Sequence, residues 1–191
     1  MSLALSLPRR DGPTVLRSLR LADLPAFAAY RADPQVAEFQ GWTPMDAVQA
    51  RRFLAETAGA TRLLPGQWVQ LGIALAATDE LVGDVGLHLA ADATVVELGF
   101  TLARAHQRQG HGLRAVGLAA GAAFEHACVV QLRARTDARH PAAITLLGRA
   151  GFAPAGSIDT VFKGRPCTEL AFVRPRPPLS AARPAAPGRS R

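Results

Sequence analysis

The chain has 191 residues, of which 49% are apolar and 19% are charged. This size and composition predict one globular domain with a hydrophobic core and exclude a mainly disordered protein. No apolar run reaches the roughly 18 residues of a membrane-spanning helix, and the short apolar start Met1–Leu7 lacks the pattern of a signal peptide. We therefore expect a cytoplasmic protein without a membrane partner. Cys128 and Cys167 are too few for a disulfide framework and lack metal-ligand spacing, so we expect no metal site.

The formal net charge of +7 raises the question of nucleic-acid binding. The excess of basic residues lies at the C-terminal end, in Arg174, Arg176, Arg183, Arg189 and Arg191. Because residues 13–173 are nearly neutral, we expect no DNA partner. The sequence predicts a flexible N-terminus (1–12), one domain (13–174) and a disordered tail rich in Pro, Ala and Arg (175–191). A weak RNA or ribosome contact through this tail is the alternative to a tail without a partner.

Hydrophobic periodicity and turn residues predict the elements in chain order. A strand is expected at 14–21, and helices at 24–32 and from 44 to about 58. Strands at 68–76, 81–90 and 95–103 are separated by short turns, which favours antiparallel hairpins. A polar loop (104–112), a helix (113–126), a strand (129–136), a helix (141–150) and two strands (153–162, 167–173) follow. The pattern predicts an α+β fold with a mixed, mostly antiparallel sheet of about seven strands flanked by about four helices.

The stretch that carries chemistry is LGFTLARAHQRQGHGLRA, residues 98–115. It predicts a strand, a polar loop with Gly110 and Gly112, and the start of a helix. Unpaired N–H groups and a partial positive charge at a helix start favour an anion, and glycine lets the backbone approach a phosphate closely. The motifs of nucleotide P-loops and dinucleotide-binding loops are absent. A flexible helix entry with solvent-facing arginines is the alternative interpretation, and we expect His111 to be a solvent-exposed loop residue.

The run Gln107–Gly112 resembles the Gln/Arg-x-x-Gly-x-Gly/Ala signature of the GNAT acetyltransferases. The stretches at 81–89, 97–100 and 151–152 are similar to that family as well, and the resemblance covers roughly residues 16 to 173. Gly41-Trp42 followed by Pro44, and the segments 162–165 and 169–170, resemble its RimJ/RimL-type branch. The resemblance implies a GNAT fold.

The resemblance also implies an N-acetyltransferase that uses acetyl-CoA as co-substrate and a primary amine as acceptor. The amine would attack the thioester directly, and a protein N-terminus or a small amine would supply it. The pantetheine arm would contact the backbone of Leu98, Gly99, Phe100 and Thr101, and the pyrophosphate would contact the backbone of Arg108, Gln109, Gly110, Gly112 and Leu113. A homodimer is a further expectation from the family.

The chain departs from the family pattern after the fifth central strand. His140 stands where many members have an asparagine, and we expect it to contact the cofactor. Leu147 stands where some members have a tyrosine that protonates the CoA thiolate, and the only tyrosine is Tyr30 in the first helix. These departures leave open a non-catalytic GNAT module that binds acyl-CoA or serves as a scaffold.

Two side chains are candidates for the catalytic base. Glu97 is an acid in an apolar strand, where burial would raise its pKa toward that of a base, and alternation places it on one face with Gly99 and Thr101. His88 lies on the neighbouring strand. The alternative roles are a structural carboxylate for Glu97 and a packed histidine at the sheet surface for His88.

Overall fold

The computed structural model describes residues 2–178 of the chain. It contains two short 3-10 helices (η1, Leu21–Asp23; η2, Arg104–His106) and five α-helices. The α-helices are α1 (Leu24–Arg31), α2 (Pro34–Ala37), α3 (Ala47–Thr57), α4 (His111–Phe124) and α5 (Pro141–Arg149). The strands are β1 (Leu3–Ala4), β2 (Arg9–Asp11), β3 (Thr14–Ser18), β4 (Arg62–Leu63), β5 (Trp68–Leu75), β6 (Leu81–Leu89), β7 (Val95–Leu102), β8 (Gln131–Asp137), β9 (Ala153–Phe162) and β10 (Arg165–Pro175).

Eight strands form one sheet in the order β2-β3-β5-β6-β7-β8-β10-β9. Every neighbouring pair in it is antiparallel except β7 and β8, which the crossover helix α4 connects. This confirms the expected α+β fold with a mixed, mostly antiparallel sheet. All seven expected strands are present, and β2 adds an eighth because Arg9–Asp11 pairs with β3.

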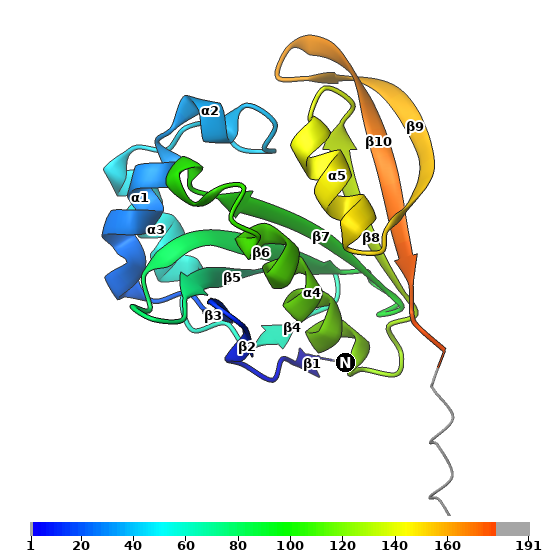
Figure 1. The fold of residues 1–191 in the computed structure, drawn as a ribbon, viewed down its shortest axis with the longest axis horizontal. Coiled ribbons are helices and arrows are strands. Elements are labelled where there is room, and N and C mark those ends of the chain that lie inside the picture. Colours follow the sequence, from blue (N-terminus) through cyan, green and yellow to red (C-terminus); the bar gives the residue numbers. More distant parts are fainter. Residues whose placement is uncertain (1, 179–191) are drawn as a thin grey trace, which may run out of the picture.

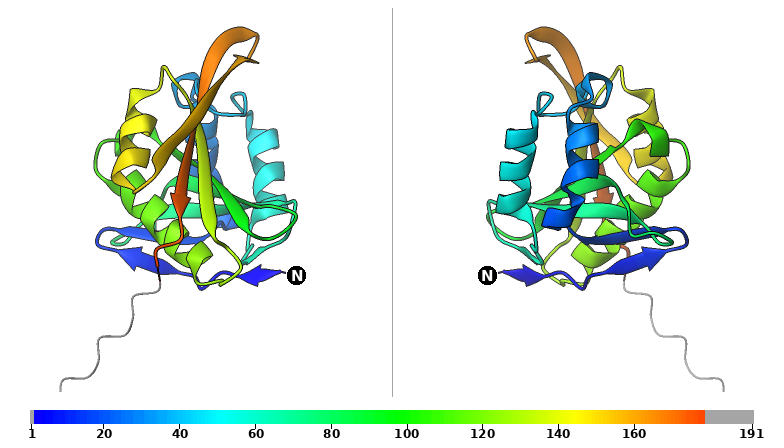
Figure 2. Two further views of the ribbon diagram at one scale, coloured as in Figure 1. Left: turned by 90° about the vertical axis from the view of Figure 1, so that its right-hand side faces the viewer. Right: turned by 90° about the vertical axis from the view of Figure 1, so that its left-hand side faces the viewer.

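Helices cover both faces of this sheet (Figures 1 and 2). Helices α4 and α5 pack on one face, where small side chains of α4 such as Ala119 and Ala123 let it lie close to the strands. Helices α1 and α3 pack on the other face through a second cluster, which includes Phe27, Leu54 and Leu81. Among the described residues, no helix combines the length and the apolar character needed to cross a lipid bilayer.

The N-terminal segment differs from the expectation of a flexible residue range 1–12. Leu3 and Leu5 are only 2% and 5% exposed, because β1 pairs with β4 and buries these apolar side chains in the main core. At the other end, Arg176 donates hydrogen bonds to the backbone O atoms of Val129 and Phe124, at 2.9 and 2.7 Å, so the fold continues past the expected boundary at 174. Residues 179–191, and with them most of the expected tail and its RNA contact, lie outside the described residues.

The feature that positions the site is the short pairing of the two parallel strands. Only Val95–Glu97 of β7 pairs with Gln131–Arg133 of β8. Beyond Glu97, β7 continues beside β6, whereas β8 continues beside β10. The two strands therefore diverge in the middle of the sheet, and beyond Glu97 the edge of β7 that faces β8 is not paired with it (Figure 1).

A buried polar cluster fixes α1 to β6. Asp84 accepts hydrogen bonds from the Tyr30 hydroxyl (2.6 Å), the Arg31 guanidinium (2.8 Å) and the Gln70 amide (2.6 Å). Asp84 and Arg31 are 1% and 2% exposed, and Trp42 covers the Arg31 guanidinium at 4.4 Å from its ring centre. Burial, and then the charge of Asp84, raise the pKa of the Tyr30 phenol well above its usual value. The only tyrosine of the chain is thus part of the contact between α1 and β6.

Candidate active site

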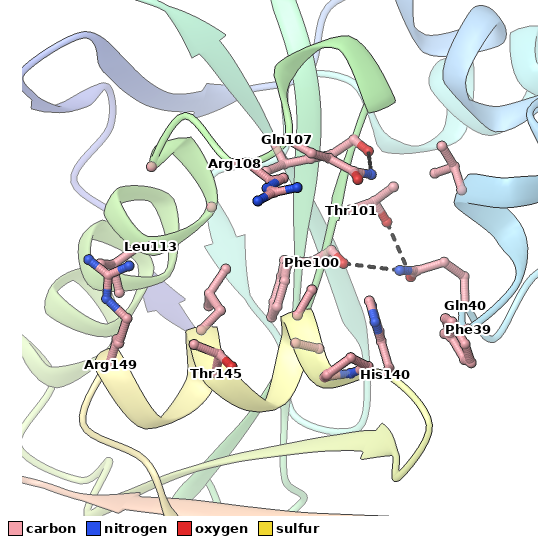
Figure 3. A pocket seen from close by; sticks show the side chains of 18 of the residues that line it. Phe39, Gln40, Phe100, Thr101, Gln107, Arg108, Leu113, His140, Thr145 and Arg149 are labelled. Atoms are coloured by element: carbon pink, nitrogen blue, oxygen red, sulfur yellow. Dashed lines mark hydrogen bonds between the residues drawn. The ribbon is translucent and has the colours of Figure 1, made fainter.

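A pocket of about 700 Å³ opens where β7 and β8 diverge. Its walls come from the end of β7, the loop before α4, the first turns of α5 and the segment around α2 (Figure 3). Of the residues expected to hold the cofactor, the ones that line it are Phe100, Thr101, Arg108, Gly110, Gly112, Leu113 and His140. The pocket therefore brings together the end of the central strand and the glycine loop, while Leu98, Gly99 and Gln109 are not among the residues that line it.

The strand β7 offers backbone groups to this pocket. The N–H group of Ala103 donates to the backbone O atom of Val82, so these two residues form a hydrogen-bonded pair between β6 and β7. In an antiparallel pair of strands every second residue belongs to such a pair, and in β7 these residues include Thr101 and Gly99. The peptide groups of Leu98 and Phe100 then point away from β6, toward the gap left by β8. The Glu97–Arg133 pairing uses the Leu98 N–H, and the Gln40 amide donates to Phe100 O, so the Leu98 O atom and the Phe100 N–H group are left for a ligand lying in the gap.

The loop before α4 presents the start of that helix without a side-chain cap. Gly110 is the N-cap residue with φ of 84°, and no side chain accepts a hydrogen bond from the first turn. The first backbone bond of the helix runs from Arg114 N to Gly110 O, so the N–H groups of the first three helical residues have no partner within the helix. Arg108, with φ of 62°, also takes the left-handed conformation.

Side chains in the same loop bind backbone and leave the N–H groups accessible. Gln107 donates to Leu102 O at 3.1 Å, and Gln109 donates to Ala105 O at 2.8 Å. A Cβ atom at Gly112 would lie 2.8 Å from the Leu146 side chain, so a larger residue here would have to displace that side chain where α4 starts beside α5. Free N–H groups, a helix start and the Arg108 side chain fit a diphosphate, which is an elongated anion.

His111 is buried, contrary to the expectation of a solvent-exposed loop residue. It is 4% exposed, and its Nδ1 atom lies 2.8 Å from the hydroxyl oxygen of Thr14, which is fully buried. Burial, and then the nearby His106 and Arg114, lower the pKa of His111. The neutral ring thus attaches the first helical residue of α4 to β3. No local pattern predicts this contact, because the two residues are 97 positions apart.

His140 lies at the pocket, where the sequence predicted a contact with the cofactor. It is the residue before Pro141 at the start of α5, and its ring stacks on Phe39 with a centroid distance of 4.5 Å. Burial lowers the pKa of His140, while the carboxylates of Glu38 and Asp137 act against this shift. At neutral pH the ring is therefore uncharged, and it offers one donor and one acceptor nitrogen.

The two candidate bases are neighbours, but they lie outside the pocket lining. His88 and Glu97 stand directly opposite each other in the register of β6 and β7 and so share one sheet face. A Glu97 oxygen lies 3.8 Å from the Arg135 guanidinium, and the His88 ring packs against Trp68 at 5.3 Å. Gly86 and Gly99 form the next pair toward the pocket; Trp68 and Gln70 cover Gly86, whereas the space over Gly99 is open, and we call this open sheet surface between Glu97 and Thr101 the shelf.

Two residues at the pocket were missed in the sequence. Phe39 and Gln40, which follow α2, line it next to Phe100 and Thr101 (Figure 3). The only sequence signal was their position directly before the Gly41-Trp42 turn. Gln40 contacts residues that are about 60 positions away, so local patterns do not reveal its location.

Comparisons with solved structures agree with this geometry. An acetyltransferase of the GNAT family from Bacillus anthracis superposes with a TM-score of 0.79 at 14% identity, covering 89% of this chain and 99% of that one. Spermidine N-acetyltransferase from Vibrio cholerae, solved with CoA and spermine, gives 0.74 at 16% identity with coverage of 87% and 97%. RimL, an acetyltransferase of ribosomal protein L7/L12 solved with coenzyme A, gives 0.74 at 12% identity with coverage of 86% and 95%.

At these sequence identities the comparisons show a shared fold, and the activities named are those of the compared proteins. No curated protein matches the sequence well enough to be counted as a relative. The family described as "Acetyltransferase (GNAT) domain" matches residues 14–153, which is most of the chain and contains β7, the glycine loop and α4. The chain therefore belongs to the GNAT acetyltransferase family.

Proposed function

We propose that this protein is a cytoplasmic N-acetyltransferase of the RimJ/RimL type that transfers the acetyl group of acetyl-CoA to a primary amine. The observation that carries this proposal is the gap beside β7, which opens directly onto the uncapped start of α4. A strand edge with free peptide groups suits an extended amide chain, and the helix start suits a diphosphate. Acetyl-CoA contains both groups in that order, and bound there it would supply a thioester carbonyl to the acceptor.

The residues present fit such a cofactor. The Leu98 O atom and the Phe100 N–H group would bind the pantetheine amides, and the N–H groups of Gly112 and Leu113, together with the loop at Arg108, would bind the pyrophosphate. His140 would contact the arm from α5. Backbone groups carry most of this recognition, which explains why the side chains of Gln107 and Gln109 can be used to hold the loop itself.

The transfer requires a neutral amine next to the thioester carbonyl. The nitrogen forms a bond to the acetyl carbon, the carbon–sulfur bond breaks, and the proton lost by nitrogen ends on the CoA sulfur or in water. The free N–H group of Phe100 on β7 would stabilise the negative charge that develops on the carbonyl oxygen. Glu97 and His88 would accept the amine proton through water, because both face the open shelf rather than the pocket itself.

Within this class we propose the α-amine of a protein N-terminus as the acceptor. The shelf carries Glu97, but Arg135 lies 3.8 Å from that carboxylate, and Arg133 is its partner in the register of β8. A polyamine would need several unpaired acids to balance its charges. An N-terminal peptide has one amine and a neutral backbone, which suits a shelf of mixed charge that is open over Gly99.

The cofactor site can be tested by isothermal titration with acetyl-CoA. We expect micromolar binding that is lost in Gly110→Val, because Gly110 has φ of 84° and valine strongly disfavours that conformation. Gly117→Ala, inside α4 and with open space around the added methyl group, is the matched control. No binding at millimolar acetyl-CoA would refute the proposal. Binding without turnover of any amine would instead indicate the non-catalytic module, which the replacement of asparagine by His140 favours.

The role of Glu97 has its own test. If this carboxylate accepts the amine proton, Glu97→Gln should lower kcat about a hundredfold, which is the usual contribution of a general base. The measurement is the pH dependence of kcat with a peptide acceptor. An unchanged profile would remove Glu97 from the mechanism and leave His88 as the candidate.

A further inference from the structure

The segment after α2 places one amide side chain between the pocket and the open shelf. Gln40 donates from its Nε2 atom to Phe100 O at 3.3 Å, and its Oε1 atom accepts from the Thr101 hydroxyl at 3.2 Å (Figure 3). A carbonyl oxygen can only accept, so the contact with Phe100 fixes which end of the amide is nitrogen. One lone pair of Oε1 is left over from the Thr101 contact.

The two hydrogen-bond partners of Gln40 lie in different directions from β7, one at the strand edge and one on a face of the sheet. The backbone O atom of Phe100 points toward the gap, where the thioester would lie, whereas the Thr101 side chain shares its sheet face with Gly99 and Glu97. The amide therefore lies at the boundary between the proposed cofactor site and the shelf. An amine that approaches the thioester from the shelf has to pass this side chain.

The backbone around Gln40 is held at both ends by one side chain. Lys163, the only lysine of the chain, donates from Nζ to Ala37 O at 2.6 Å and to Trp42 O at 2.7 Å. Ala37 O also accepts the Gln40 N–H at 3.0 Å. Lys163 lies in the turn between β9 and β10, so it connects that hairpin to the segment 37–42 across the mouth of the pocket.

Stacked side chains complete the placement of this segment. Phe39 stacks on His140 at 4.5 Å, and Trp42 lies over the Arg31 guanidinium at 4.4 Å. The residues on both sides of Gln40 are therefore fixed by α5, by α1 and by Lys163. A side chain held in this way loses little conformational entropy when a substrate binds to it.

We propose that Gln40 binds the acceptor amine and orients it toward the thioester, and that Lys163 is the positioning residue that holds Gln40 in place. The proposal rests on the acetyltransferase function proposed above. The free lone pair of Oε1 accepts an N–H of the neutral amine, which turns the nitrogen lone pair toward the carbonyl carbon. A carboxylate at this position would instead favour the charged ammonium, which has no lone pair for attack.

This chemistry makes the choice of glutamine testable. Gln40→Ala should raise the KM for the amine and lower kcat/KM about tenfold, which corresponds to one hydrogen bond. It should not raise the Kd for acetyl-CoA above that of the unchanged protein. Gln40→Glu should shift the pH dependence of kcat to higher pH, because the carboxylate raises the pKa of the bound amine. Gln67→Ala, an exposed glutamine before β5, is the matched control and should change none of these values.

Lys163→Met tests the positioning role, because methionine keeps much of the length but donates no hydrogen bond. We expect it to raise the amine KM in the same direction as Gln40→Ala, and Lys163→Arg to restore part of the loss. The double variant Gln40→Ala/Lys163→Met should be no worse than Gln40→Ala alone, because Lys163 acts through Gln40. A thermal unfolding curve of each variant confirms that it is folded under the assay conditions.

The outcomes separate this proposal from the proposed function. If the unchanged protein acetylates an amine and Gln40→Ala keeps its KM and kcat, the role of Gln40 is wrong while the transferase stands. Additive losses in the double variant would overturn the positioning role of Lys163. If the unchanged protein acetylates no amine, the function and this inference fail together.

Discussion

The buried pair of Asp84 and Arg31 makes α1 depend on a single carboxylate. In Asp84→Asn the side chain keeps its shape and can still accept the Tyr30 hydroxyl, but the Arg31 charge loses its counterion. Arg31 is 2% exposed, so water cannot replace the carboxylate. Removing one partner of a buried ion pair costs about 3–5 kcal/mol. We expect about 3 kcal/mol, at the lower end, because the amide keeps a hydrogen bond.

For a domain of this size, a loss of about 3 kcal/mol lowers the midpoint of thermal unfolding by about 6–12 °C. Differential scanning calorimetry and urea titration of the same variants measure the midpoint and the free energy of unfolding. Asp79→Asn is the matched control. The Asp79 side chain is 51% exposed, and its partner Arg17 keeps the buried Asp23, so we expect a change within about 1 kcal/mol.

The double variant Arg31→Met/Asp84→Asn distinguishes charge from packing. Methionine removes the buried charge and retains most of the side-chain volume that Trp42 covers. We expect this variant to be more stable than Asp84→Asn alone, because no unpaired charge is left in the core. If its loss equals the sum of the two single losses, or if Asp84→Asn is no worse than Asp79→Asn, the argument from the unpaired charge is wrong.

Two further predictions concern the glycine loop and the end of β8. Gly112→Val should raise the Kd for acetyl-CoA at least about tenfold and destabilise the fold by about 1–3 kcal/mol, since its Cβ would lie 2.8 Å from Leu146. Isothermal titration measures the Kd, thermal unfolding measures the stability, and Gly117→Ala is the control for both. Arg139 holds the pKa of Asp137 at about 2, so the ionised carboxylate stabilises the fold above its unfolded pKa of about 3.9 and this contribution is lost as the pH falls toward 2. Urea unfolding should therefore show that Asp137→Asn is less stable than the unchanged protein at pH 7, and that this difference in the free energy of unfolding shrinks between pH 4 and pH 2. A difference that stays constant with pH would contradict the role assigned to the ionised Asp137.

The elements with local signals could be predicted from the sequence. The strand at Val95–Leu102 and the glycine loop were recognised because alternation, two glycines and the change to helical period follow one another within a few residues. The same local signals located Pro141 at the start of α5. The family resemblance then assigned the cofactor to this loop, and the pocket brings most of the named residues together.

Contacts between distant segments could not be predicted in this way. The apolar residues Leu3 and Leu5 gave no strand pattern of usable length, and their burial depends on β4, about 60 positions later. His111 looked like an exposed loop residue because its partner Thr14 lies on β3. Gln40 is a glutamine between an aromatic residue and a glycine, and only its contact with Phe100 shows where it lies.

The buried cluster and the proposed acceptor site share a residue, which affects how activity should be measured. Trp42 stacks on Arg31 with its ring and accepts a hydrogen bond from Lys163 with its backbone oxygen. A change at Asp84 that displaces Arg31 can therefore also loosen the segment that carries Gln40. Assays well below the unfolding midpoint should then show a higher amine KM in Asp84→Asn with an unchanged Kd for acetyl-CoA, because Trp42 and Arg31 are not among the residues that line the pocket. An equal loss in both constants would instead indicate that the whole pocket, rather than this segment, depends on the buried pair.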